Sequence, residues 1–238
     1  MGEKLHSVGS NEEGQLGIEK SSVVDHSLLQ QPQFPSGYRS RGLACGWSHS
    51  LVLSDAPDGQ TAVIGFGGND FHQLALSASQ TSLPTAIPLP IGLRVAFVAC
   101  GMRHSAFVCD SGALWLFGEN RFGQCGVSSL APIEVPTRAE IEGKVSSVSL
   151  GARHTVCALN SGRVLSFGEN RFGQCGVNPA SVSPLTLTIP GKKPRQVSDI
   201  LPTPTRVDLH IEERPNTIVK CGWNFSLVWQ PPSPQDSL

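Results

Sequence analysis

Short apolar runs separated by turns dominate the pattern of hydrophobic and polar positions along the chain. The clearest series consists of the runs Val95–Cys100, His104–Cys109 and Ala113–Phe117, with the polar turn Asp110–Gly112 between the last two. Apolar runs of this length, bounded by Gly, Asp and Ser, are typical of β-strands. The segment is therefore predicted to form an antiparallel meander.

A second series repeats this pattern about fifty residues later. Its predicted strands are Val145–Leu150, Thr155–Leu159 and Val164–Phe167, and its turn is Asn160–Gly162. Gly112 and Gly162 end the two turns, where a three-residue hairpin loop favours a residue with positive φ. With 25 Gly, 18 Pro and only 16% charged residues, the composition also suits many short strands, so the chain is predicted to be all-β.

Two sequence phrases recur along the chain. The phrase Phe-Gly-Glu-Asn-Arg-Phe-Gly-Gln-Cys-Gly-Val occupies 117–127 and 167–177 without change, and looser copies occupy 8–18 and 66–76. A second phrase, built on Gly-x-x-His-Ser/Thr and an apolar run, occupies 45–53, 100–108, 150–158 and, with Phe in place of His, 221–229. Such recurrence indicates a repeat architecture. The repeats are predicted to cover approximately 1–42, 43–94, 95–143 and 144–217 of a single domain.

The segments outside the phrases are rich in Ser and Pro. Residues 77–90 and 128–136 are expected to be surface connectors, 178–216 a long Pro-rich loop, and 231–238 a flexible tail. Residues 5–18 carry only the eleven-residue phrase, whereas 218–230 carry only the other phrase. Together these two segments make up one repeat.

Charge and hydropathy narrow the function classes. The net charge is -1 and there is no cluster of five or more Lys and Arg, so the electrostatic footprint of nucleic-acid binding is missing. The sequence contains no run of 18 apolar residues, so no membrane span is predicted. The expected location is intracellular, in the cytoplasm, the nucleus or both. The seven cysteines recur at equivalent repeat positions and are expected to be free thiols.

The paired phrases, Gly-x-x-His-Ser/Thr followed by a hairpin and then Phe-Gly-x-Asn-x-x-Gly-Gln-Leu/Cys-Gly, resemble the repeat of the regulator of chromosome condensation family. The resemblance covers nearly the whole chain apart from its connectors. It implies a β-propeller, in which each blade is a four-stranded antiparallel sheet. Family propellers typically have seven blades, whereas four copies of each phrase indicate about four.

The split repeat suggests how such a ring would close. A last blade assembled from N-terminal and C-terminal strands removes two exposed sheet edges. We therefore expect the strand near Leu5–Gly9 to pair with the strand near Phe225–Trp229, and residues 218–230 to complete the first blade. The alternative is a shortened relative whose ring is open or is completed by another chain.

Most of the repeated residues have a structural explanation. The glycines allow tight bends, the histidines and their neighbouring hydroxyls can satisfy backbone groups at a strand start, and the asparagines suit turns. These structural residues are Gly46, His49, Gly101, His104, Gly118, Asn120, Gly123, Gly151, His154, Gly168, Asn170, Gly173 and Gly222. A metal site at the recurring histidines is disfavoured because Phe225 replaces the fourth. No phosphate-binding glycine motif occurs, and no cofactor is expected.

The arginines are not required by strand geometry. Arg103, Arg121, Arg153 and Arg171 recur in equivalent positions and are candidate partner-binding residues. The alternative is that they are solvated turn residues that pair with Glu119 and Glu169. The most basic segment adds three further candidates, Lys192, Lys193 and Arg195.

The sequence favours a non-enzymatic protein–protein interaction scaffold. The alternative, which the resemblance implies, is a guanine nucleotide exchange factor or regulator for a small Ras-like GTPase. Bond-making catalysis is disfavoured because no Gly-x-Ser-x-Gly, His-Glu-x-x-His or Cys-x-x-Cys motif occurs. A protein partner is expected, whereas its identity, the binding face and the oligomeric state stay open.

Overall fold

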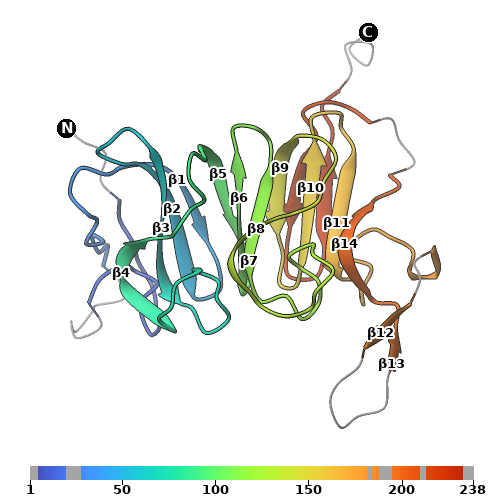
Figure 1. Ribbon diagram of the computed structural model, residues 1–238, viewed down its shortest axis with the longest axis horizontal. Helices are drawn as coiled ribbons and strands as arrows, with labels where there is room; N and C mark the ends of the chain where they lie inside the picture. The colour runs from blue at the N-terminus through green and yellow to red at the C-terminus, as the bar shows by residue number, and fades with distance from the viewer. Residues whose placement is uncertain (1–4, 20–27, 182–183, 188–194, 210–212, 233–238) are drawn as a thin grey trace. The chain divides into compact units, whose positions relative to one another are not determined.

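The structure, a computed structural model, describes residues 5–19, 28–181, 184–187, 195–209 and 213–232 (Figure 1). Within these residues the secondary structure is β, apart from one short 3-10 helix, η1, at Pro179–Ser181. No helix among them has the length and apolar character needed to cross a membrane. The chain divides into two compact units: unit 1 runs to Glu119 and includes Pro132–Arg138, and unit 2 holds Asn120–Ala131 and the residues from Ala139 onward.

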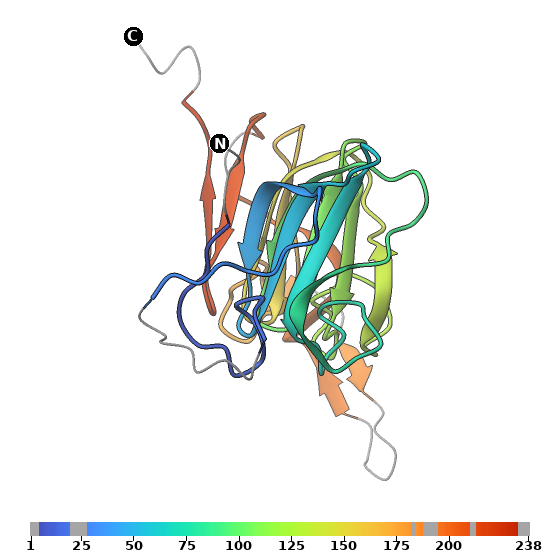
Figure 2. The ribbon, with the colours of Figure 1, turned by 90° about the vertical axis from the view of Figure 1, so that its left-hand side faces the viewer.

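Unit 1 contains two four-stranded antiparallel sheets. The first has the order β1-β2-β3-β4, whose strands run side by side in Figure 2, and the second has the order β5-β6-β7-β8. The strands are β1 (Arg39–Cys45), β2 (His49–Asp55), β3 (Thr61–Gly68), β4 (Gln80–Ala86), β5 (Val95–Cys100), β6 (His104–Cys109), β7 (Leu114–Gly118) and β8 (Ile133–Arg138).

Unit 2 contains one four-stranded sheet and two hairpins. The sheet has the order β14-β11-β10-β9, and the hairpins are β12-β13 and β15-β16. The strands are β9 (Val145–Leu150), β10 (His154–Leu159), β11 (Val164–Glu169), β12 (Leu185–Leu187), β13 (Arg195–Val197), β14 (Ile200–Arg206), β15 (Ile218–Cys221) and β16 (Ser226–Trp229).

The predicted meanders are confirmed. Strands β5, β6 and β9 have the predicted bounds, while β7, β10 and β11 differ from them by one or two residues at their ends. Gly112 and Gly162 have φ values of 82° and 92°, the left-handed conformation that the hairpin turns were expected to require.

The fourth strand of each sheet lies in a segment whose composition indicates a loop. The predicted connectors 77–90 and 128–136 contain β4 and the start of β8, and the predicted loop 178–216 contains β12 to β14. Each fourth strand lies at the sheet edge and includes a Pro-Thr pair, at 84–85, 136–137 and 204–205. The pairing with the third strand is irregular near each of these sites. Proline is tolerated there because an edge strand with a bulge leaves N–H groups that need no ladder partner.

Side chains are buried on both faces of the inner strands. All six residues of β6 and all six of β10 are buried. In unit 1 the core joins Leu51 and Leu53 of β2 to Phe107 of β6. In unit 2 the core joins Val156 of β10 to Val219 of β15. Neighbouring sheets within a unit therefore share one apolar layer, which is the arrangement that stacked repeats require.

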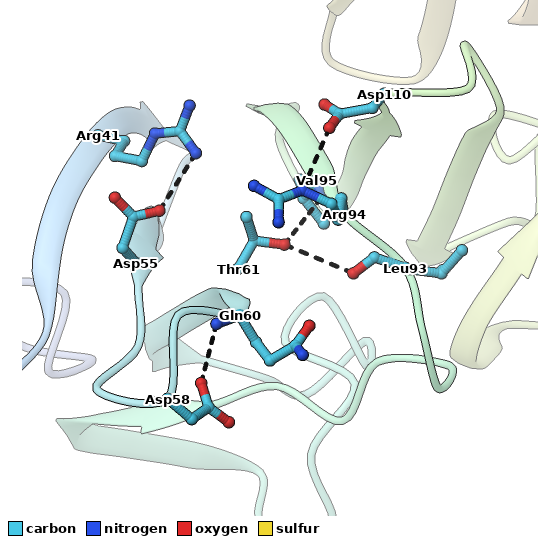
Figure 3. Close-up of polar contacts among 9 residues, drawn as sticks. All are labelled: Arg41, Asp55, Asp58, Gln60, Thr61, Leu93, Arg94, Val95 and Asp110. Carbon is cyan, nitrogen blue, oxygen red and sulfur yellow. Dashed lines mark hydrogen bonds and ion pairs between the residues drawn. The ribbon is translucent and has the colours of Figure 1, made fainter.

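Polar contacts join the outer ends of the two sheets in unit 1 (Figure 3). The Thr61 hydroxyl at the start of β3 accepts a hydrogen bond from the Val95 amide, 2.9 Å away, and lies 3.5 Å from the Leu93 carbonyl oxygen. The two ion pairs Arg41–Asp55 (3.2 Å) and Arg94–Asp110 (3.5 Å) each stay within one sheet and are exposed. The buried hydroxyl bridge therefore contributes more to stability than the exposed pairs do.

The expected closing strand pair is not among the strand pairs of the described residues. The backbone of Ser7 pairs instead with Gln30, and β16 pairs with β15. The expectation relied on the sum of two half repeats. Each half has its own local partner, so the count of repeats does not by itself determine which strands pair.

Candidate functional site

The asparagine of the eleven-residue phrase organises its loop. Asn170 Oδ1 accepts a hydrogen bond from the Cys175 amide (3.0 Å), and its Nδ2 donates to the Val177 carbonyl (2.7 Å). Asn120 in the twin phrase accepts from the Cys125 amide at 2.8 Å. Both asparagines are buried, so water cannot hydrogen-bond the backbone groups around them. The asparagine side chains instead bond these groups, which the bend would otherwise leave unpaired. Each asparagine side chain thus bonds the backbone of its own loop.

Replacing Asn170 with Ala should therefore destabilise the chain. The substitution leaves the Cys175 amide and the Val177 carbonyl without their side-chain partners in a buried loop. We expect the free energy of unfolding to fall by about 2 kcal/mol, measured by urea titration. Asn224→Ala, at a half-buried position outside the phrase, is the matched control and should change it by less than about 0.5 kcal/mol. Equal effects of the two changes would contradict this role for Asn170.

The glycines serve the predicted bends. Gly118 and Gly168 both have φ of 111°, and Gly123 and Gly173 both have φ of 76°. Gly151, by contrast, lacks positive φ and is required for space: a Cβ there would overlap the ring of His154. The spacing Gly-x-x-His thus places the imidazole against the bare backbone of its own turn.

The recurring histidines connect one repeat to the next. His49 Nε2 lies 2.9 Å from Ser105 Oγ, and His154 Nε2 lies 2.9 Å from Ser226 Oγ. The same Ser105 hydroxyl donates to the Gln73 carbonyl (2.7 Å). The expectation that histidine and hydroxyl satisfy backbone groups is therefore correct for the hydroxyl. The Nε2 atoms of His49 and His154 also have a partner that the expectation did not include, a hydroxyl of the following repeat. The His154 imidazole has a backbone partner as well, at Phe225. The residue spacing within a phrase contains no information about the hydroxyl partner.

Burial keeps these imidazoles neutral. Desolvation lowers the pKa of His49 to about 4, and it lowers the pKa of His154 to about 4 against a smaller opposing effect of the Phe225 backbone. His104 is likewise buried. Across the described residues no group of three or more His, Cys, Asp or Glu side chains is placed to hold a metal ion. The histidines are thus internal connectors and not exposed ligands.

Arginine and phenylalanine side chains form a cluster in unit 2. The Arg153 guanidinium lies 4.7 Å from the Phe122 ring centroid, and that of Arg121 lies 5.0 Å from the same ring. Arg153 also approaches the Glu169 carboxylate at 3.6 Å, as predicted for one of the two glutamates. Arg121 is exposed, so the cluster presents guanidinium groups held on an aromatic platform. We call Arg121, Phe122 and Arg153 the arginine platform.

Arg103 is the candidate partner-binding arginine of unit 1. In unit 1, Arg103 stacks on Phe71 at 4.2 Å and lines a pocket of about 370 Å³. That pocket is also lined by the acidic residues Glu12, Glu13 and Asp70. The surroundings of Arg103 are therefore acidic.

Two further arginines are described, and two lysines are not. Arg171 of the twin phrase lies 5.6 Å from the ring of exposed Phe172. Arg195 is on β13, where its backbone pairs with Leu187. Lys192 and Lys193 lie outside the described residues. The structure brings together Arg121 and Arg153, and it gives Arg171 the same kind of aromatic support.

The aromatic partners are functional candidates that sequence reasoning missed. Phe71, Phe122 and Phe172 occupy the sixth position of three of the four phrase copies. An aromatic residue at a turn position, where packing does not require it, is a signal that could have identified them. In each copy an arginine guanidinium lies within 6 Å of the ring.

The regulator of chromosome condensation (RCC1) repeat model matches residues 3–53, 62–108, 111–158 and 161–229, and a second RCC1 repeat model matches 145–174. The chain is 33% identical over 148 residues to human probable E3 ubiquitin-protein ligase HERC6, covering 60% of this chain and 14% of that protein. It is 34% identical over 108 residues to the dog X-linked retinitis pigmentosa GTPase regulator, and this match covers 44% of this chain and 10% of that protein. The chain thus spans a small part of the length of these relatives.

Solved structures agree with the family match. The chain superposes on yeast RCC1 (Prp20) bound to Kap60 with a TM-score of 0.77 and 20% identity, covering 98% of this chain and 51% of that one. A second structure, of Saccharomyces cerevisiae Prp20p, is described together with its binding to Gsp1p and histones. Here the TM-score is 0.76 and the sequence identity is 20%, and the match covers 98% of this chain and 53% of that one. The antiparallel four-stranded sheets are therefore blades of the RCC1 type. The repeat matches, which cover most of the chain, and the shared fold together show that this protein belongs to the regulator of chromosome condensation repeat family.

Proposed function

We propose that this protein is a non-enzymatic, intracellular protein–protein interaction scaffold and that the arginine platform is a contact surface. The observation that carries the proposal is the stacking of Arg121 and Arg153 on Phe122. A stacked guanidinium loses less side-chain freedom on binding than a free one, and its planar donors suit carboxylates. An acidic segment of a partner protein is the surface that fits it.

The reactive side chains of unit 2 support binding more than catalysis. The His154 imidazole is buried and bonded to Ser226. Burial raises the pKa of the Cys157 thiol to about 12 and that of the Cys175 thiol to about 12, so both are protonated at neutral pH. A buried, protonated thiol is a poor nucleophile. The His154 imidazole and the two thiols therefore contribute to packing inside the unit. The exposed arginines are charged groups that can contact a partner at its surface.

The second candidate is regulation of a small Ras-like GTPase, including guanine nucleotide exchange. The observation that favours it is the similarity to a relative whose name is GTPase regulator and to Prp20p, described with its binding to Gsp1p. Nucleotide release from purified small GTPases is the direct test. Acceleration by the wild-type chain would support regulation, and no acceleration across a panel of GTPases would remove it.

Affinity capture from cells tests the scaffold proposal. Arg121→Glu combined with Arg171→Glu reverses the exposed charge of the platform and the exposed charge at the same position of the twin phrase, and it leaves the Arg153–Glu169 ion pair unchanged. We expect captured partners to fall at least about tenfold relative to wild type, in line with loss of two guanidinium contacts. Arg39→Glu combined with Arg138→Glu reverses two exposed charges on unit 1 strands and should retain those partners. Equal capture by both double variants would overturn the assignment of the contact surface to the arginines of the two phrases.

A further inference from the structure

The hairpin β15-β16 has the form of half a blade. In the complete sheets the second strand pairs on both sides, as β2 does with β1 and β3, and as β10 does with β9 and β11. Strand β16 is equivalent to β2 and β10 by its sequence phrase, but in the described part of the chain it pairs with β15 alone. Its second edge therefore presents backbone groups that a third strand satisfies elsewhere in the fold.

One face of β16 is exposed where its equivalents are buried. Leu51 and Val156 are 0% and 2% exposed, whereas Leu227 at the same repeat position is 61% exposed. The next residue on this face, Trp229, is 54% exposed. Large apolar side chains that recur at a buried position indicate a face built to be covered.

An apolar pocket marks the place of the missing third strand. At Gly126 the ring of Phe167, from the third strand of the following sheet, covers the bare backbone. The Phe66 ring covers Gly17 in the same way. Among the atoms of the described residues, a Cβ added at the equivalent Gly176 would meet only Val207 Cγ1 within 4 Å. The pocket beside Gly176 has a volume of about 300 Å³ and is also lined by Val156, Phe172 and Val228.

The N-terminal segment has the complementary form. Ser7 pairs with Gln30, as a third strand pairs with a fourth, and Val8 stands where Phe66 and Phe167 stand in their phrases. Val8 is 53% exposed. A pocket of about 440 Å³ lies beside this segment and is lined by Leu43 and Trp47, which are 61% and 63% exposed.

We propose that the β15-β16 hairpin of one molecule binds the N-terminal strand of a second copy of this chain, and that the two half blades form one four-stranded sheet. The apolar face with Leu227 and Trp229 then covers the face with Leu43 and Trp47. A second copy is the occupant that fits, because each copy presents both the half-paired hairpin and the complementary N-terminal strand, and these two are not paired with each other among the described residues. This self-association is separate from the proposed arginine platform, and neither depends on the other.

The complete sheets determine the register. Ser50 pairs with Phe66 and Leu51 with Gly65, and Thr155 pairs with Phe167 and Val156 with Ser166. Transferred to the half blades, Ser226 lies opposite Val8 and Leu227 lies opposite Ser7. A shift by one residue would move every side chain to the other face, so the register is a specific prediction.

Cysteine crosslinking between two differently tagged full-length chains tests the proposal. One chain carries Ser7→Cys and the other Leu227→Cys. Directly opposed residues in antiparallel strands meet the geometry of a disulfide, with Cβ atoms about 4 Å apart. After mild oxidation we expect a mixed, reducible dimer on a non-reducing gel, at least about five times more abundant than with Val8→Cys and Leu227→Cys, where the thiols point to opposite faces. Each single variant alone measures crosslinking through the seven native thiols.

Three other outcomes would overturn the proposal. The two substitutions can also be placed in a single chain. If that chain forms an intramolecular crosslink while the two tagged chains form no mixed dimer, the chain binds its own N-terminal strand. No crosslink in either experiment would show that this strand is not the occupant of β16, so that another protein or no strand fills the place. A light-scattering mass that stays at the 25.3 kDa of one chain at all concentrations would exclude self-association.

Discussion

Gly123→Ala is expected to lower the free energy of unfolding by about 3 kcal/mol or more, whereas Gly173→Ala is expected to cost about 1 kcal/mol. The two glycines occupy the same place in identical eleven-residue phrases and have the same φ of 76°. A Cβ at Gly123 would lie 2.5 Å from Pro202 Cα and 3.0 Å from the Leu201 carbonyl oxygen. At Gly173 no atom of the described residues lies within 4 Å.

The pair separates backbone strain from close packing. Both variants bear the cost of placing Ala at positive φ, about 1 to 2 kcal/mol. Only Gly123→Ala must also displace the backbone of β14, which cannot move aside as a flexible side chain can. Urea titrations of the two variants and wild type measure the difference. Equal losses of stability would mean that β14 does not approach the first phrase as closely as the structure places it.

The sequence predicts the inner strands well because their signals are local. Alternation of short apolar runs with Gly-ended turns identified β5, β6 and β9 with their bounds. The fourth strands were missed for a physical reason. Strands β4, β8 and β14 are edge strands with proline, many of whose residues are exposed or half-buried, so neither their hydrophobic pattern nor their composition distinguishes them from loops.

The candidate site could be predicted only in part. The recurrence of Arg121 and Arg153 in the sequence identified residues that packing does not explain, but not the Phe122 ring between them. Similarly, the spacing of His49 revealed its strand position and not its bond to Ser105, which lies 56 residues away. Contacts between repeats depend on how sheets stack, and no pattern within a single repeat determines that stacking.

Contacts between repeats also explain how identical phrases acquire different surroundings. In each copy the phrase bends through its glycines and offers its glutamine carbonyl to the next repeat: Gln73 accepts from Ser105, Gln124 from Thr155 and Gln174 from Ser226. The phrase is therefore a junction between neighbours. In the two identical copies the arginines, Arg121 and Arg171, are exposed, and they are the positions at which we propose that a partner binds.

Acid should destabilise the protein through its buried histidines. The folded-state pKa of His49 is about 4, below the value near 6.5 of an unfolded chain, and that of His154 is lowered in the same way. Between these values the unfolded chain binds a proton that the folded chain does not. The contribution to stability is therefore complete above about pH 6.5 and is lost as the pH falls to about 4, with about 3 kcal/mol lost for His49.

His154→Phe is expected to remove part of this acid sensitivity. Phe225 occupies the histidine position of its own repeat against Gly222, so the fold accepts a phenyl ring there. The variant loses the bond to Ser226, which keeps its bond to the Gln174 carbonyl, and should be somewhat less stable than wild type at pH 7.5. Urea titrations at pH 7.5 and pH 4.5 should nevertheless show a smaller difference for the variant, by about 2 kcal/mol or more.

Phe225→Leu is the matched control, because it changes the same repeat position where no group titrates. It should lower stability by similar amounts at both pH values and leave the acid-induced loss as large as in wild type. If His154→Phe also left that loss unchanged, the proton uptake on unfolding would have to come from other groups. The histidine that connects two repeats would then be ionised or hydrated in the folded state, in conflict with its complete burial.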